Sequence, residues 1–435
     1  MLKININKID INNKNFYNII KNLNNFRNKN YIKVENYIKN IIYNIKNFKD
    51  KSLKFYLKNL ESNIIKDIKE IELKKTDLEK SFYKLDNETR FMLEVSKNRI
   101  EKFHREQKKN FINNWKIIEN DGNIMGQKYN KINRMGFYIP AGKALYPSSV
   151  FMNIIPAKIS NIENITVCSP KIEKKNNLIN AALFLCGLEK MYSIGGIPAI
   201  ASMGYGNKII EKVDKICGPG NIYVSISKKL FFGKLGIDII AGPSEITIIT
   251  DGKNSIKSTI MDIFSQSEHD KLSQSIVICD NNNFINDLEL NIKKYLPFLY
   301  RKKILYNSII NNIILIKVNN INDSFNILNY ISPEHLVISL KNSLEFFKNI
   351  ENSGSIFLGK KICESLGDYS LGSNHIIPTN KNCNYSSPLG INDFYKNLNF
   401  LKTTNKSFKK LFNLTLKFSK CENLYSHGES LIFHK

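Results

Sequence analysis

The stretch Val213-Asp214-Lys215-Ile216-Cys217-Gly218-Pro219-Gly220-Asn221, followed by the helix-length segment 222–232, decides the fold class of this chain. It contains a short β-branched run, a glycine- and proline-rich turn and a helix, which together make one strand–turn–helix unit. The same order recurs after the runs at 165–168 and 191–194, which precede Ser169-Pro170 and Gly195-Gly196. Repeated units of this kind predict a parallel sheet with helices on its faces.

A second series of strand candidates occupies the C-terminal half of the chain. Longer helical stretches separate these candidates, which are residues 246–249, 275–279, 335–340 and 355–358. The predicted fold class is therefore α/β, with two doubly wound, Rossmann-like but incomplete parallel-sheet domains and small helical N- and C-terminal appendages. Ligands of such sheets gather beyond the carboxyl ends of the strands, and we expect the site there.

The N-terminal third differs from the rest in composition. Residues 1 to about 130 contain almost no Gly or Pro, and segments such as 86–111 show apolar positions at helical spacing. This region is predicted to be helical. The Asn- and Lys-rich tracts near 281–320 are interpreted as compositional drift within a solvated surface.

Charge and cysteine content limit the classes of partner. The 435 residues include 64 basic and 39 acidic side chains, which give a formal net charge of +25. Only six of the basic residues are arginine, and the lysines are spread along most of the chain, so solvated faces are expected rather than a nucleic-acid partner. Seven cysteines without a Cys-x-x-Cys pair predict reduced, buried thiols. With no signal-like N-terminus and no bilayer-length apolar run, we expect a cytoplasmic protein without a membrane partner.

Scarce histidines with polar neighbours mark the candidate site. His269 lies three residues after Gln266, so the two side chains share one face of a helix. Together with Asp368 and His427 they make a plausible nitrogen and oxygen ligand set for zinc. Glu334-His335, which follows Ser332-Pro333, would then supply acid/base chemistry at a turn or strand end.

Each of these histidines, taken singly, could equally well be a structural residue or a functional one. Four of the six histidines in the chain nevertheless have a polar functional group within a few positions; they are His269, His335, His375 and His427. His104 lies in a charged helical segment and is predicted to be a surface residue. His434 is predicted to fray with the chain end.

Several further stretches resemble the histidinol dehydrogenase family and occur in the family's order between about residues 136 and 427. They include 136–148 (Gly-Phe-Tyr-Ile-Pro-Ala-Gly-Lys-Ala-Leu-Tyr-Pro-Ser), 195–201, 213–221, 241–245 (Ala-Gly-Pro-Ser-Glu), 265–269 (Ser-Gln-Ser-Glu-His), 332–335 (Ser-Pro-Glu-His), 354–359, 367–369 (Gly-Asp-Tyr) and 372–379 (Gly-Ser-Asn-His-Ile-Ile-Pro-Thr). The N-terminal third matches only in general character.

The resemblance implies an oxidoreductase of histidine biosynthesis that converts L-histidinol to L-histidine through L-histidinal, with hydride transfer to two NAD⁺. It implies one Zn²⁺ per subunit, and Gln266, His269, Asp368 and His427 as the zinc ligands that also meet the substrate. His335 would take the alcohol proton and Glu334 would activate water. The substrate would also contact Ser244, His335 and Glu422, and the cofactor would contact Tyr138 and Asn221.

The resemblance also implies a homodimer in which the C-terminal segment of one subunit completes the site of the other. The predicted division is an N-terminal helical extension (1–28), a first α/β domain with the zinc and acid/base residues (29–137 and 244–388), a second α/β domain on the NAD side (138–243), and the C-terminal segment (389–435). Two departures concern the cofactor. Pro198 stands where the family usually has Gln, and Ala141 where Gly is usual, so weakened NAD⁺ binding is expected before lost chemistry.

Two alternatives remain open at the level of the sequence. A related dehydrogenase of the same fold could oxidise another small polyol or amino alcohol, which assays with different alcohols would reveal. A basic nucleic-acid-binding protein could instead be built on a decayed enzyme scaffold, although the intact candidate ligands and acid/base residues weigh against decay. Salt-dependent binding to a nucleic-acid duplex, together with absent zinc, would favour that second alternative.

Overall fold

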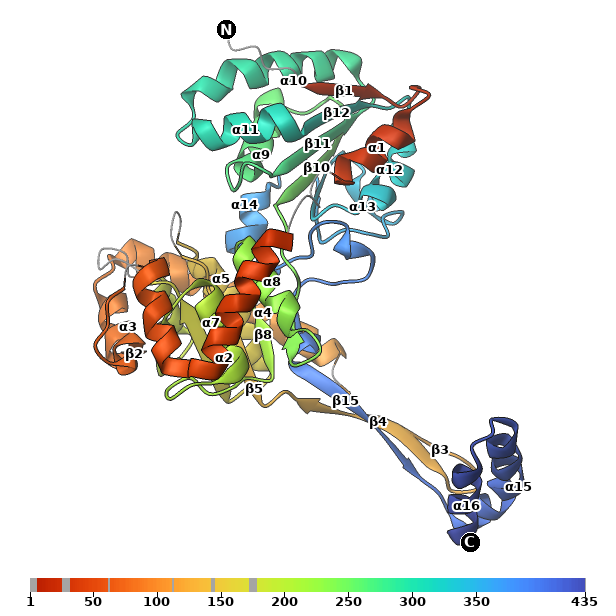
Figure 1. Ribbon diagram of the computed structural model, residues 1–435. Helices are drawn as coiled ribbons and strands as arrows, with labels where there is room; N and C mark the ends of the chain where they lie inside the picture. Colours follow the sequence, from red (N-terminus) through yellow and green to blue (C-terminus); the bar gives the residue numbers. More distant parts are fainter. Residues whose placement is uncertain are drawn as a thin grey trace.

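The computed structural model describes residues 6–25, 32–61, 63–111, 113–141, 145–171 and 178–434. Two six-stranded sheets, each with helices on its faces, and a three-stranded ribbon make up these residues (Figure 1). The middle of the glycine-containing motif at 136–148, residues 142–144, lies outside the described part of the chain, as do the ends of the predicted N-terminal extension.

The first sheet has the strand order β1-β12-β11-β10-β13-β14, and all of its neighbouring strands are parallel. The strands are β1 (Asn7–Asp10), β10 (Glu245–Thr250), β11 (Gln274–Cys279), β12 (Ile313–Lys317), β13 (His335–Ser339) and β14 (Ser355–Leu358). β12 lies inside the tract interpreted as solvated surface, and that interpretation was wrong for residues 313–316, which are buried. A strand that is buried on both faces is a continuous apolar run, as it is here.

Helices cover both faces of the first sheet. One face carries α9 (Ile256–Ser267), α10 (Asn282–Tyr295) and α11 (Lys302–Asn312), and the other carries α1 (Phe16–Asn25), α12 (Ser324–Ile331) and α13 (Ser343–Phe347). The short turn η3 (Leu296–Phe298) joins α10 to α11, and the turn η4 (Ile321–Asp323) precedes α12. The N-terminal extension therefore contributes an edge strand, β1, in addition to a helix.

The second sheet has the order β2-β7-β6-β5-β8-β9, in which only β2 is antiparallel. Its strands are β2 (Glu72–Lys74), β5 (Arg134–Tyr138), β6 (Asn164–Ser169), β7 (Lys190–Ser193), β8 (Lys215–Cys217) and β9 (Gly236–Ile237). One face carries α3 (Lys75–Tyr83), α4 (Asn87–Phe111), α5 (Pro147–Ile159) and α6 (Leu178–Leu185), and the other carries α2 (Ile32–Glu61), α7 (Gly196–Tyr205) and α8 (Ile222–Phe231). The turn η2 (Ile68–Ile71) precedes β2.

The N-terminal helices belong to this second sheet. Ile38, Ile41 and Ile45 of α2 pack in one cluster with α7 and α8, and Leu93 and Ile100 of α4 pack in another with α5. The predicted division had instead grouped residues 29–137 with 244–388. An amphipathic helix must bury its apolar face, but its sequence does not specify which sheet it covers.

A long arm projects from the second sheet and ends in two helices (Figure 1). It is the antiparallel ribbon β15-β4-β3, formed by β3 (Trp115–Ile118), β4 (Ile124–Lys131) and β15 (Tyr395–Lys402). The helices at its tip are α15 (Asn405–Cys421) and α16 (Tyr425–Phe433). Between the first sheet and the arm the chain forms α14 (Glu364–Leu366), the turns η5 (Gly367–Leu371) and η6 (Asn382–Asn384), and η7 (Ile391–Phe394).

Candidate active site

Titratable side chains converge at the amino-terminal edge of the first sheet. His335 is the first residue of β13 and is paired in register with Ile246 of β10. Gln266, in the last turn of α9, lies against the same strand ends, because its Nε2 is 3.0 Å from His335 Nδ1. The sequence placed the site beyond the carboxyl ends of the strands, whereas these candidate residues lie at the amino-terminal edge of this sheet. The rule for carboxyl ends depends on unpaired backbone groups in the turns that follow the strands. It does not apply to a site built from side chains at the start of a strand.

The backbone around β10 fixes His335 and Gln266. The Glu245 carbonyl oxygen accepts hydrogen bonds from Gln266 Nε2 at 3.1 Å and from His335 Nδ1 at 3.0 Å. A carbonyl oxygen has two lone pairs and can accept both. With its proton on Nδ1, His335 presents an unprotonated Nε2 as a base. Burial lowers the pKa of His335 to about 4, so the imidazole is neutral at physiological pH.

Glu334 precedes His335 and is equally buried. Its Oε2 accepts a hydrogen bond from the backbone N–H of Glu245 at 2.7 Å and lies 3.7 Å from His335 Nδ1. Burial, and secondarily the nearby carboxylate of Glu245, raises the pKa of Glu334 well above its ordinary value. The chain can pass this closely because of Gly354, where an added Cβ would lie 2.6 Å from the Glu334 carbonyl oxygen.

A carboxylate pair faces the other edge of the imidazole. One ligand atom each from His335, Glu364 and Asp368 lie within 4.8 Å of one another, the spacing of groups that could share a metal ion. Glu364 Oε1 is 3.7 Å from His335 Nε2, and Glu364 Oε2 is buried without a hydrogen-bond partner in the described part of the chain. Burial, and next the charge of Asp368, raises the pKa of Glu364 well above its ordinary value.

Sequence reasoning missed Glu364. Its position four residues before Asp368 was an available signal, since residues four apart share one face of a helical turn. Here the turns α14 and η5 carry both carboxylates toward His335.

Two more histidines lie at this edge. His269 follows α9 and is solvent-exposed; partial desolvation lowers the pKa of its imidazole, while the charge of Asp368 acts in the opposite direction. His375 Nδ1 is 3.1 Å from the Asp368 backbone oxygen and 4.0 Å from its Oδ1. Ser244 lies immediately before β10, and its carbonyl oxygen accepts from Gln274 N–H at 3.0 Å. Gln266, His269 and Asp368 are thus close to the Glu334-His335 pair.

The prediction for His104 was wrong, because its side chain is fully buried. Nδ1 lies 2.9 Å from Gln107 Oε1, and Nε2 lies 3.3 Å from Asn374 Nδ2. Asn374 in turn donates to the Met152 carbonyl at 2.8 Å, which connects the loop before His375 to the second sheet's helices. A charged neighbourhood in sequence does not reveal that one position of a helix faces inward.

The two residues predicted to meet the cofactor lie at the carboxyl ends of β5 and β8, where the order of the second sheet reverses. Such a switch point is the usual ligand crevice of an open α/β sheet. Tyr138 ends β5, is buried, and its hydroxyl accepts from Gly196 N–H at 3.2 Å; burial raises its pKa to about 12. Asn221 is exposed and caps α8, accepting from Tyr223 and Val224 N–H at 3.1 and 3.2 Å.

Glu422 and His427 lie elsewhere. Glu422 is the C-cap of α15 and His427 lies in α16, and both side chains are exposed. The helices that carry them lie at the far tip of the arm, well separated from β13 and α14 of the same chain (Figure 1). Within one protomer the structure does not bring these two residues to the others.

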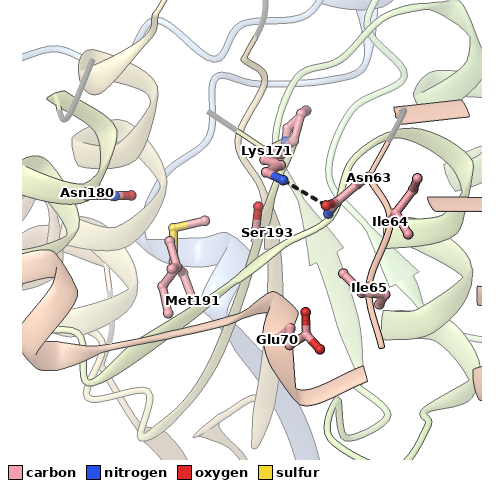
Figure 2. Close-up of a pocket in the computed structure, with 10 residues that line it drawn as sticks. Asn63, Ile64, Ile65, Glu70, Lys171, Asn180, Met191 and Ser193 are labelled. Carbon is pink, nitrogen blue, oxygen red and sulfur yellow. Dashed lines mark hydrogen bonds between the residues drawn. The ribbon is translucent and has the colours of Figure 1, made fainter. Parts of the chain in front are cut away.

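A cavity of about 210 Å³ lies at the second sheet, near the carboxyl ends of β6 and β7. Figure 2 shows Lys171 reaching across it to Asn63, with Nζ 2.9 Å from Oδ1, and Ser193 and Met191 on the strand side. It is separate from the cluster around His335.

Comparison with known proteins identifies the family. The sequence profile of the histidinol dehydrogenase family matches residues 25–434. The chain belongs to the histidinol dehydrogenase family. It is 37% identical to the histidinol dehydrogenase of Neisseria gonorrhoeae over 387 residues, 88% of each chain, and 36% identical to that of Nitrosomonas europaea over 398 residues, 91% of each chain. The crystal structure of histidinol dehydrogenase from Elizabethkingia anophelis superposes with a TM-score of 0.90 at 30% identity, covering 98% of this chain and 97% of that one.

Family membership makes the protein an oxidoreductase, and its sheets agree with the predicted α/β class. Of the two departures from the family pattern, Pro198 lies buried in the first turn of α7, where a missing backbone N–H costs no helical hydrogen bond. Ala141 pairs with Leu145 in an isolated bridge beside the undescribed residues 142–144. No helix in the described residues combines the length and apolarity that a bilayer crossing requires.

Proposed function

We propose that this histidinol dehydrogenase family member oxidises L-histidinol to L-histidine through L-histidinal, with Zn²⁺ bound in each subunit and two NAD⁺ as hydride acceptors. The observation that carries the proposal is the convergence of Gln266, His335 and Asp368, from three distant parts of the sequence, at one edge of the first sheet. No specific feature of the described residues favours the alternatives of a different alcohol substrate or of a nucleic-acid-binding role.

The donor set fits zinc. Gln266 Nε2 faces the Glu245 carbonyl, which leaves the amide oxygen as the ligand atom. His269 and Asp368 add imidazole nitrogen and carboxylate oxygen, which zinc accepts, and we assign the remaining position to His427 of the partner subunit. Zinc bound there would orient the substrate and, through its charge, lower the pKa of neighbouring carboxyl groups. Ser244 and the partner subunit's Glu422 would contact the substrate.

His335 and Glu334 divide the proton transfers. The unprotonated Nε2 of His335 is directed toward the carboxylates of Glu364 and Asp368, on the side where the substrate would bind, and it takes the alcohol proton. Glu334 activates the water that adds to the aldehyde. Burial raises the pKa of its carboxyl group, which makes the ionised form a stronger base.

The connection between the two sheets, residues 238–244, supports a cofactor site near this pair. That segment runs from the end of β9, at the carboxyl edge of the second sheet, directly to Glu245 at the amino edge of the first. Tyr138 and Asn221 at the first of these edges are the proposed cofactor contacts. A short connection between the two edges keeps the acid/base pair close to the cofactor.

The arm supports a homodimer with shared sites. Its ribbon and helices expose large apolar side chains, among them Trp115, Ile118, Leu401, Phe418 and Phe433. A three-stranded ribbon without a covered face gains little stability, and contiguous exposed apolar surface is typical of an interface. We place Glu422 and His427 of each subunit at the His335 cluster of its partner. The free state of all seven cysteines, each within the described residues, supports a cytoplasmic location.

Steady-state assays of the purified protein with L-histidinol and NAD⁺ test the proposal, together with the zinc content per chain. We expect two NADH per histidinol, one zinc per subunit, and loss of both zinc and activity in His269→Ala. The matched control is His434→Ala, which changes an exposed histidine at the end of the chain. Asn221→Ala should raise the KM for NAD⁺ and leave zinc content unchanged. Purified, zinc-loaded dimer that produces no NADH from histidinol would refute the proposal.

A further inference from the structure

Lys228 and Asp238 form a buried ion pair beneath the turn that joins β8 to α8. Lys228 lies in α8, Asp238 follows β9, and each side chain is only 1% exposed. Burial removes the hydration of both charges, so apolar residues of similar volume often stabilise a protein equally well. Packing alone therefore does not explain why charged side chains occupy these two positions. Their contacts with the backbone give a reason.

Both partners bind the same residue. Lys228 Nζ donates to the Gly218 carbonyl oxygen at 2.9 Å, and the Gly218 N–H donates to Asp238 Oδ2 at 2.7 Å. Gly218 has φ +117°, and a Cβ there would lie 2.1 Å from the carbonyl oxygen of Tyr138. The ion pair thus holds both polar backbone groups of Gly218 while the turn packs directly on the end of β5.

The turn and the connection between the sheets meet at this pair. Three residues after Gly218, Asn221 caps α8 at the switch point between β5 and β8. Asp238 begins the segment that leads to β10, and Ser225 of α8 donates to the Ala241 carbonyl of that segment at 3.0 Å. Movement at Gly218 would therefore be transmitted both to Asn221 and to the connection that ends at Glu245.

We propose that Lys228 and Asp238 are positioning residues for the dinucleotide: they hold the 218–221 turn in its binding conformation before the cofactor arrives. This inference rests on the cofactor site proposed above. Neither side chain is exposed, so neither touches the cofactor. A turn that is already ordered gives tighter binding, because no conformational freedom has to be lost when the ligand binds.

The double variant Lys228→Met/Asp238→Leu is the test. A single change would leave one charge buried without its partner and could unfold the domain. Replacing both side chains with Met and Leu removes both charges and fills the same volume with apolar groups. The control is Lys215→Met, which removes another mostly buried lysine at the opposite end of β8, where it pairs with Asp393 at 2.9 Å. Hydrogen exchange of the amides of 218–224 is measured without NAD⁺, alongside steady-state kinetics.

In the double variant we expect those amides to exchange about tenfold faster or more, because the turn opens locally. We expect the KM for NAD⁺ to rise about tenfold while kcat at saturating NAD⁺ and the KM for histidinol change less than about twofold, because only preorganisation is lost. Lys215→Met should change neither exchange nor the KM for NAD⁺.

Unchanged exchange of the turn in the folded double variant would overturn the inference and leave the proposed function standing if Asn221→Ala still weakens NAD⁺ binding. Faster exchange with an unchanged KM for NAD⁺ would also overturn it. If Asn221→Ala is then equally without effect, the failure belongs to the proposed cofactor site.

Discussion

The cluster at the edge of the first sheet and the helices at the tip of the arm present their candidate site residues in opposite ways. Gln266, Glu334 and His335 are buried and hydrogen-bonded to the backbone of Glu245 at the start of β10. Glu422 and His427 are exposed, on helices far from that cluster (Figure 1). The buried half of the site is ordered by the core of its own protomer. The exposed half requires contacts from a second subunit.

The largest effect should come from the buried half. His335→Asn removes the proposed base but keeps a side chain that can donate to the Glu245 carbonyl, so we expect kcat to fall roughly 10²- to 10⁴-fold with the zinc content unchanged. Steady-state kinetics with histidinol and metal analysis measure both. His434→Ala is the control and should keep full activity. A kcat within a few-fold of the wild type would remove His335 from the acid/base role.

Mixing subunits tests the exposed half. His335→Asn and His427→Ala homodimers should each be nearly inactive. After subunit exchange in equal amounts, half of the dimers are heterodimers, and each has one fully intact site if arms are shared, so activity should return to about a quarter of the wild-type value. NADH production after exchange provides the measurement. If each arm served its own subunit, every site would keep one defect and the mixture would stay inactive.

The pH dependence of stability tests the burial of His335. His335 has a pKa of about 4 in the folded protein and an ordinary value near 6.5 when unfolded, so the unfolded state takes up its proton first. Stability is unaffected by His335 above pH 6.5 and is lost as the pH falls from 6.5 to 4, by about 3 kcal/mol in total. Denaturant unfolding of metal-free protein across this range should show a smaller loss for His335→Gln than for the wild type.

A smaller effect is expected at the buried His104. His104→Ala leaves the side chains of Gln107 and Asn374 without their ring partner, which should lower the free energy of unfolding by about 1–3 kcal/mol. Thermal or denaturant unfolding gives the value, and kcat should change little, since His104 is not among the residues at the His335 cluster. A variant as stable as wild type would mean that the buried contacts of His104 contribute nothing.

The local signals in the sequence were sufficient for most strands of the two sheets. Strands predicted at 165–168, 191–194, 246–249 and 355–358 correspond to β6, β7, β10 and β14, and the predicted helix 222–232 corresponds to α8. Each is a mostly apolar run with a glycine or proline within three positions of its end, so neighbours in the sequence determine it. The arm's ribbon was missed because β3 and β15 are mostly exposed on both faces, and because β15 pairs with β4 across more than 260 positions, as Leu398 does with Lys128.

The sequence by itself determined the α/β class, the family resemblance and the identity of Gln266, His269, Glu334, His335 and Asp368 as candidates, because residue type and spacing carry that information. Tertiary structure alone decided that these side chains meet at the amino edge of the first sheet, that Glu364 joins them, and that Glu422 and His427 stand apart on the arm. Such placement depends on strand order and on the packing of distant segments. Strand order and packing are determined by the burial of apolar surfaces to which many distant residues contribute. A local sequence pattern does not contain this information.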